Sequence, residues 1–219
     1  MNGNWNIKGL IIEGISGTGK TTVLKELLRS NQYLNRKYLS SLVLSEHHTQ
    51  RVLEKKDHEG TITPDDNINL LMSIVHILKV FSDGLNHRDW ISQDYVEHRF
   101  IYILERFHFT HVYQYEHMNW ELAKPIDNEL HNLGAKLCIL TVNDIQLRER
   151  LFRRKNPCWM KYLKKFGATE EEIVARFMRD QEKILEMSKD SALPTIIVDT
   201  SSIDNRSVTK QIMDFCGFL

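Results

Sequence analysis

A glycine-rich stretch between residues 11 and 22 constrains this chain more than any other part of it. The stretch reads IIEGISGTGKTT, in which an apolar run ends at Gly14 and a loop with further glycines leads to Lys20 and Thr21. The spacing fits the pattern G-x-x-x-x-G-K-[ST] in full, after an apolar run and before a helical pattern. We therefore predict a strand, a phosphate-binding loop and a helix in this order.

The residue types of this loop suit a chain of phosphates. Glycines allow the backbone to wrap with its N–H groups pointing inward, and the following helix adds its free N–H groups and its positive dipole end. Lys20 supplies a mobile charge for the outer phosphates, and the Thr21 hydroxyl can ligate Mg²⁺. We predict binding of ATP with Mg²⁺ through Gly14, Ser16, Gly17, Thr18, Gly19, Lys20, Thr21 and Thr22.

Apolar runs alternate with helical patterns along the whole chain. Such alternation requires crossover connections, hence a mainly parallel sheet with helices on both faces, in a single domain covering residues 1–219. The expected strands cover residues 8–14, 41–46, 99–105, 135–142 and 194–200. The expected helices cover 20–30, 64–84, 108–133, 169–189 and a last segment from about residue 205.

Two of the expected strands end in acidic residues. Ligands of open α/β sheets bind at the carboxyl ends of strands, so Glu105 can support Mg²⁺ and Arg106 can position a substrate. Glu46 would face the space beyond the outer phosphate, where a carboxylate can accept a proton from an attacking hydroxyl. The alternatives are a structural ion pair for the first two residues and an exposed glutamate for the third.

A basic segment follows the fourth expected strand. Residues 148–165 hold eight basic side chains and one acid, and Arg150, Arg153 and Arg154 are spaced to share one helix face. Arginines on a flap over about residues 148–166 could close on a nucleotide and stabilise charge in the transition state. A solvated basic face is one alternative. A nucleic-acid patch is another, because aromatic residues interleave with the lysines.

The composition excludes several classes of protein. The 29 basic and 29 acidic residues balance, so the whole chain is not an electrostatic nucleic-acid binder. Three scattered cysteines favour a reducing compartment, and we expect a cytoplasmic protein without a signal peptide. The apolar stretch LLMSIVHILKVF is short and carries His76 and Lys79, so we expect no membrane span.

A phosphate-binding loop could also belong to a GTPase or a motor ATPase. The guanine-specific pattern N-K-x-D is absent, since the chain reads TVNDIQ after the fourth expected strand. In this order, GISGTGKTT, Glu46, ERF at 105–107 and LRERLFRR resemble the thymidylate kinase and deoxynucleoside kinase group. ERF is similar to the E-R-S pattern of deoxynucleoside kinases and to the D-R-Y/F/H pattern of thymidylate kinases, but equals neither. Thymidylate kinases have an R-E-P pattern at the position of Glu46, and here both the arginine before it and the proline after it are missing.

The resemblance implies a P-loop NTPase three-layer α/β fold with a five-stranded parallel sheet, a helical lid and often a homodimer. It implies a transferase that moves the γ-phosphoryl of ATP to a small acceptor, most simply a nucleoside or nucleoside monophosphate. Another hydroxyl compound such as an antibiotic stays open, as does a nucleotide-dependent switch or nucleic-acid-associated ATPase. The catalytic residues would be Lys20, Glu46, Glu105, Arg106, Arg153 and Arg154, with Thr21 and Glu105 at the metal and Arg150 at the nucleotide.

Overall fold

The sheet of this protein has five parallel strands in the order β2-β3-β1-β4-β5. We describe a computed structural model, which covers residues 7–30, 33, 40–86, 100–154, 156–202 and 204–217. Its strands are β1 (Ile7–Glu13), β2 (Ser40–Leu44), β3 (Phe100–Glu105), β4 (Ala135–Thr141) and β5 (Thr195–Asp199). The predicted five-stranded parallel sheet is therefore confirmed. Its two central strands, β1 and β3, are almost fully buried, as their near-continuous apolar sequences require.

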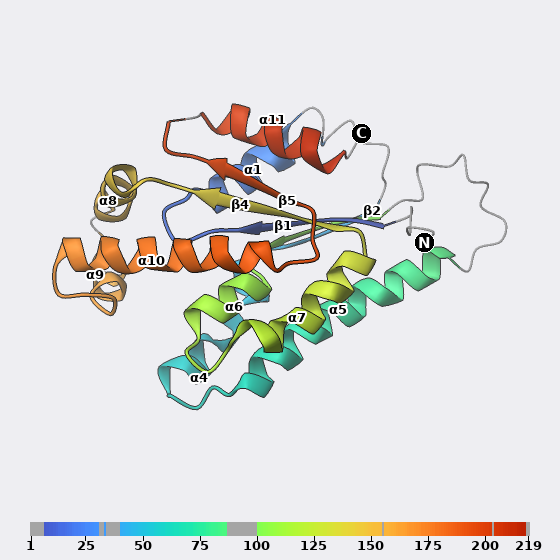
Figure 1. Ribbon diagram of the computed structural model, residues 1–219, viewed down its shortest axis with the longest axis horizontal. Helices are drawn as coiled ribbons and strands as arrows, with labels where there is room; N and C mark the ends of the chain where they lie inside the picture. The colour runs from blue at the N-terminus through green and yellow to red at the C-terminus, as the bar shows by residue number, and fades with distance from the viewer. Residues whose placement is uncertain are drawn as a thin grey trace.

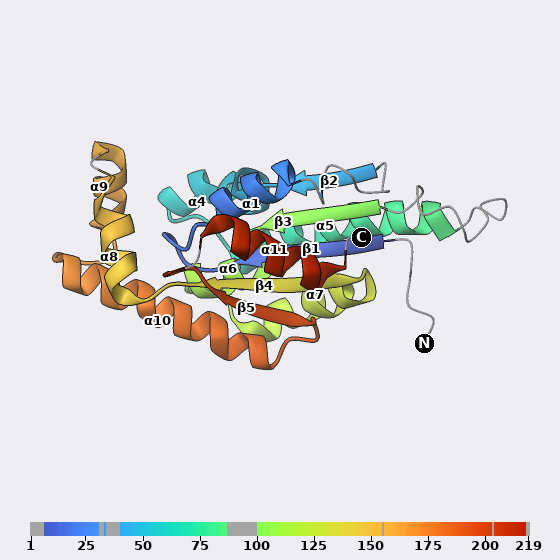
Figure 2. The same ribbon diagram turned by 90° about the horizontal axis from the view of Figure 1, so that it is seen from above.

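Helices cover both faces of the sheet (Figures 1 and 2). α1 (Lys20–Arg29) and α11 (Asn205–Cys216) pack together on one face, over a core that includes Leu10, Ile12 and Val23. The other face is covered by α5 (Pro64–Asn86), α6 (His108–Gln114), α7 (Trp120–Asn132) and α10 (Glu170–Lys189). The short elements are α3 (Glu46–Thr49), η1 (Arg51–Leu53), α4 (Glu54–His58), α8 (Asp144–Phe152) and α9 (Pro157–Leu163). The three-layer α/β fold is confirmed, while the boundaries of the domain and lid stay predictions.

Two of the predicted elements were wrong in extent. The strand expected over 41–46 ends at Leu44, and Glu46 is the first residue of α3, where a carboxylate suits the positive end of the helix dipole. The helix expected over 108–133 is two helices, because Tyr115 is extended and ends α6. The Asn119 side chain then accepts a hydrogen bond from the Leu122 N–H and starts α7.

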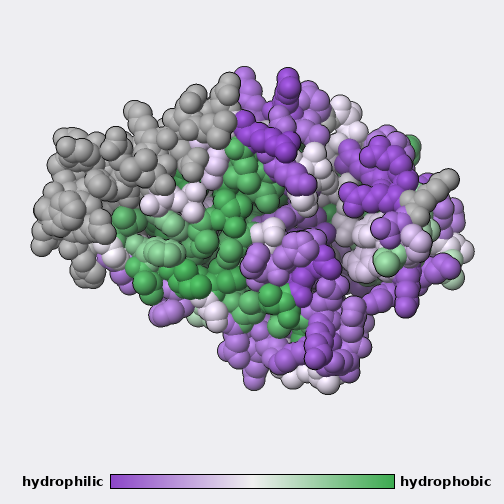
Figure 3. Space-filling view, turned by 180° about the vertical axis from the view of Figure 1, so that it is seen from behind, coloured by the Kyte–Doolittle hydropathy of each residue, from purple (hydrophilic) through white to green (hydrophobic). Residues whose placement is uncertain are grey.

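Helix α5 was predicted over 64–84 and extends two residues further, to Asn86. Its stretch Pro64–Leu85 could cross a membrane by length and composition alone, so the argument from shortness was wrong. One side of the helix packs in the core through Leu71, Val75 and Leu78, and α5 contacts α7. Apolar residues also gather on the outside of this region (Figure 3), where Val80 is 55% exposed. The predicted homodimer stays a prediction.

Close packing of β1 against β3 generates the first testable prediction. A Cβ on Gly9 would lie 2.1 Å from the Tyr102 ring, whereas a Cβ on Gly84 in α5 would meet nothing within 4 Å. We expect Gly9→Ala to lower the free energy of unfolding by about 1–3 kcal/mol through overpacking. Gly84→Ala, the matched control, should leave it unchanged or raise it by up to about 1 kcal/mol. Urea unfolding measures both, and equal stabilities of the two variants would contradict the prediction.

Candidate active site

The predicted phosphate-binding loop connects β1 to α1. Gly14, Gly17 and Gly19 have φ angles of 138°, 90° and 88°, a region that side chains disfavour. A Cβ on Gly14 would also lie 2.4 Å from the carbonyl oxygen of Leu140 in β4. Thr18 is buried and its hydroxyl donates to the Ile15 carbonyl across the turn. The glycines are therefore required by the shape of the loop, as the sequence indicated.

Lys20 lies folded back on this loop. Its ammonium group is buried and donates to the carbonyl oxygens of Gly14 and Ile15 at 2.6 and 2.7 Å. Burial lowers the pKa of Lys20 well below its usual range, and nearby Arg106 lowers it further. Glu105, Glu13 and Glu46 act in the opposite direction, and a polyphosphate in the loop would add further negative charge beside the ammonium group.

Thr21 and Glu105 meet beside the loop, as predicted. The Thr21 hydroxyl donates to Oε1 of Glu105 at 2.6 Å, although the two residues are 84 positions apart in the sequence. Glu105 is 1% exposed, and its Oε2 has no hydrogen-bond partner in the described part of the chain. A hydroxyl and a carboxylate with a vacant oxygen fit Mg²⁺, which usually takes only one or two protein ligands beside phosphates and water.

Arg106 joins the loop to the neighbouring groups. Its guanidinium donates to the Tyr113 hydroxyl at 3.0 Å and the Ser16 hydroxyl at 3.1 Å, and Nε forms an ion pair with Glu46 at 2.8 Å. Burial alone would lower the pKa of Arg106, but Tyr113 and Glu46 hold it above its usual range. Among the described non-glycine residues only Arg106 has a positive φ, 54°, which indicates backbone strain at this position.

Glu46 thus reaches the site although it does not end a strand. Its helix is fixed by Thr49, whose hydroxyl donates to the Glu105 carbonyl at 2.6 Å. The buried His111 ring lies 2.8 Å from the Thr49 carbonyl oxygen and binds Asn67 with its other nitrogen. Burial lowers the pKa of His111 to about 4, so this support stays uncharged at neutral pH.

Sequence reasoning missed Glu13. This fully buried carboxylate at the end of β1 accepts from the Phe107 N–H at 2.7 Å and from the Thr110 hydroxyl at 2.6 Å. It also accepts a longer bond from the Thr110 N–H. These contacts fix the turn that carries Arg106. An acidic residue ending an otherwise apolar strand was the available signal.

The predicted lid arginines separate into two groups. Arg150 donates to the Gly17 carbonyl and to Thr200 at the end of β5, so it lies against the phosphate-binding loop. α8 ends at Phe152, but Arg153 keeps helical backbone angles and its N–H donates to the Glu149 carbonyl, so it lies one helical turn after Arg150. Arg153 and Arg154 are both exposed. The shared face of the three arginines and the catalytic role of Arg153 and Arg154 stay predictions.

The aromatic residues of the basic segment pack on one another. Trp159 stacks on Tyr162, Tyr162 meets Phe166 edge-on, and Phe166 contacts Phe177 of α10, with ring centroids between 4.9 and 5.3 Å apart. The Trp159 indole N–H donates to the Leu151 carbonyl. In this arrangement the aromatic rings hold the segment to α10.

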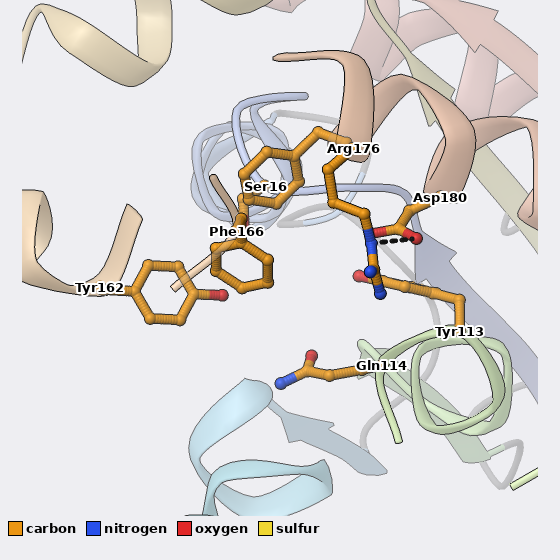
Figure 4. A pocket seen from close by; sticks show the side chains of 8 residues that line it. Ser16, Tyr113, Gln114, Tyr162, Phe166, Arg176 and Asp180 are labelled. Carbon is orange, nitrogen blue, oxygen red and sulfur yellow. Dashed lines mark hydrogen bonds and ion pairs between the residues drawn. The ribbon is translucent and has the colours of Figure 1, made fainter. Parts of the chain in front are cut away.

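A small hollow, open to solvent, lies beside the Arg106 contacts (Figure 4). Ser16 of the phosphate-binding loop and Tyr113 form the part next to Arg106. The remaining lining residues come from α6, α10 and the basic segment: Gln114, Tyr162, Phe166, Arg176, Phe177 and Asp180. The hollow therefore lies where a second substrate could approach the outer phosphate.

Comparison with known proteins relates the chain to kinases. No protein-family model matches the chain. The chain is 29% identical to thymidylate kinase of Prochlorococcus marinus (strain AS9601) over 163 residues, which cover 68% of this chain and 71% of that protein. The resemblance that the motifs predicted is thus confirmed.

Solved structures show the same fold. The YorR protein of Bacillus subtilis, solved with phosphorylated GDP, is 15% identical with a TM-score of 0.53, and the match covers 94% of each chain. Shikimate kinase of Bacteroides thetaiotaomicron is 14% identical with a TM-score of 0.51, over 95% of this chain and 97% of that one. This protein has the fold and the phosphate-binding loop of a P-loop kinase.

The role of Glu13 gives the second prediction. Glu13→Ala leaves three buried donors without an acceptor, each at a cost of about 1–3 kcal/mol. We expect the free energy of unfolding to fall by about 3 kcal/mol or more, and by less for Glu13→Gln, which keeps one acceptor oxygen. Glu186→Ala, at an exposed position of α10, should change it by no more than about 0.5 kcal/mol. Denaturant titration measures all three, and a Glu13→Ala variant as stable as the Glu186→Ala control would reject this role.

Proposed function

We propose that this protein is an ATP-dependent phosphotransferase whose acceptor is a nucleoside or a nucleoside monophosphate. The observation that carries the proposal is the set of Arg106 contacts. One guanidinium binds Ser16 of the phosphate-binding loop, Glu46 and Tyr113, and so connects the donor side to the hollow. The similarity to thymidylate kinase supports a nucleotide acceptor over an unrelated hydroxyl compound.

On the donor side, the loop and α1 bind the phosphates of ATP. Lys20 leaves the Gly14 and Ile15 carbonyls and turns to the outer phosphates, where its charge offsets the charge that spreads over the transferring group. Thr21 and Glu105 would hold Mg²⁺, which would neutralise phosphate charge. Arg150 stays beside Gly17 and borders the nucleotide.

On the acceptor side, Arg106 and Glu46 hold the attacking oxygen. If the acceptor is a nucleoside, Glu46 accepts the hydroxyl proton while the oxygen bonds to the γ-phosphorus and the bond to the β-phosphate oxygen breaks. If the acceptor is a monophosphate, its oxygen is already ionised and Arg106 is the more important group. Arg153 and Arg154 would approach the transferring phosphoryl group only when the lid closes.

The proposal is tested by ADP release with ATP and Mg²⁺, first without an acceptor and then with nucleosides, nucleoside monophosphates and aminoglycosides. We expect little release without an acceptor and clear release with at least one nucleoside or monophosphate. Lys20→Ala should lower turnover by roughly 10²–10³-fold while the fold persists. Rapid turnover without any acceptor that increases with added polynucleotide would overturn the proposal in favour of a nucleic-acid-associated ATPase.

Glu46 separates the two acceptor classes. With a nucleoside, Glu46→Gln should lower kcat by roughly 10²–10⁴-fold with little change in the affinity for ATP. With a monophosphate the loss should be small, because no strong base is needed. The control is Glu54→Gln, in the adjacent α4, whose carboxylate pairs with Arg51 and not with Arg106. Steady-state kinetics checks both variants, and full activity of Glu46→Gln toward a nucleoside would remove the base role.

A further inference from the structure

Arg176 and Asp180 form a polar pair one helical turn apart on α10, inside the hollow. Nε of Arg176 lies 3.3 and 3.4 Å from the two carboxylate oxygens of Asp180. Asp180 is 3% exposed, and burial raises its pKa although Arg176 acts in the opposite direction. Burying a carboxylate costs desolvation free energy. Because Asp180 lies in a hollow beside the phosphate-binding loop, we look for a role beyond its ion pair with Arg176.

The Arg176–Asp180 pair leaves hydrogen-bonding groups free to face the hollow. Figure 4 shows the end of the Arg176 guanidinium extending into the hollow, across from the Gln114 amide. Within the described residues, the pair is joined only through Nε, which leaves the two terminal nitrogens for a ligand. Arg176 thus offers donors and Asp180 offers acceptors side by side.

The other walls of the hollow suit a flat and uncharged group. Phe166 and Phe177 present aromatic rings, and Tyr162 lies beside them. A phosphate here would lie close to the Asp180 carboxylate and be repelled, whereas a heterocycle can stack on a ring. The charged end of an acceptor would instead point to Arg106, which is reached past Ser16 and Tyr113.

We propose that Arg176 and Asp180 are the specificity-determining pair of the acceptor site and hold the edge of a nucleobase. Arg176 donates to a carbonyl oxygen or ring nitrogen of the base, and Asp180 accepts from the adjacent N–H. The inference rests on the proposed function and deepens it, because it assigns the base to this hollow and the reacting oxygen to Arg106 and Glu46. Nothing in the pair touches the transferred phosphoryl group.

The first test uses the unaltered protein and a series of acceptors. The series contains the deoxynucleosides, their 5′-monophosphates, and deoxyribose with and without a 5-phosphate. The best base is then compared with a derivative in which methyl replaces the edge N–H: at the ring nitrogen for thymine or guanine, and as the dimethylamino compound for adenine or cytosine. Sites built to hydrogen-bond a substrate group reject analogues that lack it, so we expect kcat/KM to fall at least tenfold on methylation and further for the sugars without a base.

The second test uses Asp180→Asn and Arg176→Lys. The amide of Asp180→Asn can donate as well as accept, so the order of preference among the bases should change. Arg176→Lys keeps the charge but loses the flat pair of terminal nitrogens. Each variant should raise KM for the best base at least tenfold and change kcat little, because the pair binds the base and not the reacting atoms. Thermal unfolding by circular dichroism checks that each variant is folded.

The matched control is Glu186→Gln with Lys189→Gln, an exposed ion pair on the same helix. These changes should leave KM and base preference as in the unaltered protein. The inference is overturned if the methylated base reacts as well as its parent. It is also overturned if Asp180→Asn lowers kcat/KM by the same factor for every acceptor, so that the preference among bases does not change. A protein that binds ATP but transfers to no member of the series overturns the proposed function instead, so the two failures are distinguishable.

Discussion

The buried guanidinium of Arg106 is the interaction on which the rest of the site depends. A cation out of water must be paired and hydrogen-bonded, or its burial is too costly. The partners come from three places in the sequence: Ser16 before α1, Glu46 at the start of α3 and Tyr113 in α6. Satisfying this one charge therefore fixes the relative positions of the phosphate-binding loop, Glu46 and the hollow proposed for the acceptor. The positive φ of Arg106 and the buried Glu13 beneath its turn are the local means by which the chain holds it there.

The sequence predicted the strand, loop and helix that carry Lys20 and Thr21 because this part of the structure is local. Gly14, Gly19, Lys20 and Thr21 lie within eight consecutive residues, and their spacing alone requires the loop. Glu105 was found because it ends a buried strand. The acceptor half could not be predicted in the same way, since Tyr113, Arg176 and Asp180 meet only after two crossovers and have no common motif. Glu46 shows the limit: its role was argued from a strand end, yet it starts a helix and reaches the site through Arg106.

Most of the charged side chains of the site contact a partner of opposite charge, so the site is not a patch of a single sign. Glu46 pairs with Arg106 and Asp180 pairs with Arg176, whereas Glu105 accepts a hydrogen bond from the uncharged Thr21 hydroxyl. Lys20 is the exception among these, since it is held by backbone carbonyls alone. A bound nucleotide would therefore give Lys20 a charged partner in place of the two carbonyl groups. The ion pairs of Arg106 and Arg176 would not need to break for this exchange. The chain as a whole stays neutral, which agrees with a small ligand better than with a polyanion.

The aromatic contacts of the basic segment have a thermodynamic consequence. Tyr162 and Phe166 belong to that segment, yet they also form walls of the acceptor hollow, and Phe166 rests on Phe177 of α10. The hollow therefore has all of its walls only when this segment packs against α10, as it does in this structure. An acceptor that prefers the docked form must stabilise it, and by reciprocity a nucleotide that docks the segment must raise the affinity for the acceptor. The two substrates would then bind with positive cooperativity, with a few aromatic contacts as the link between them.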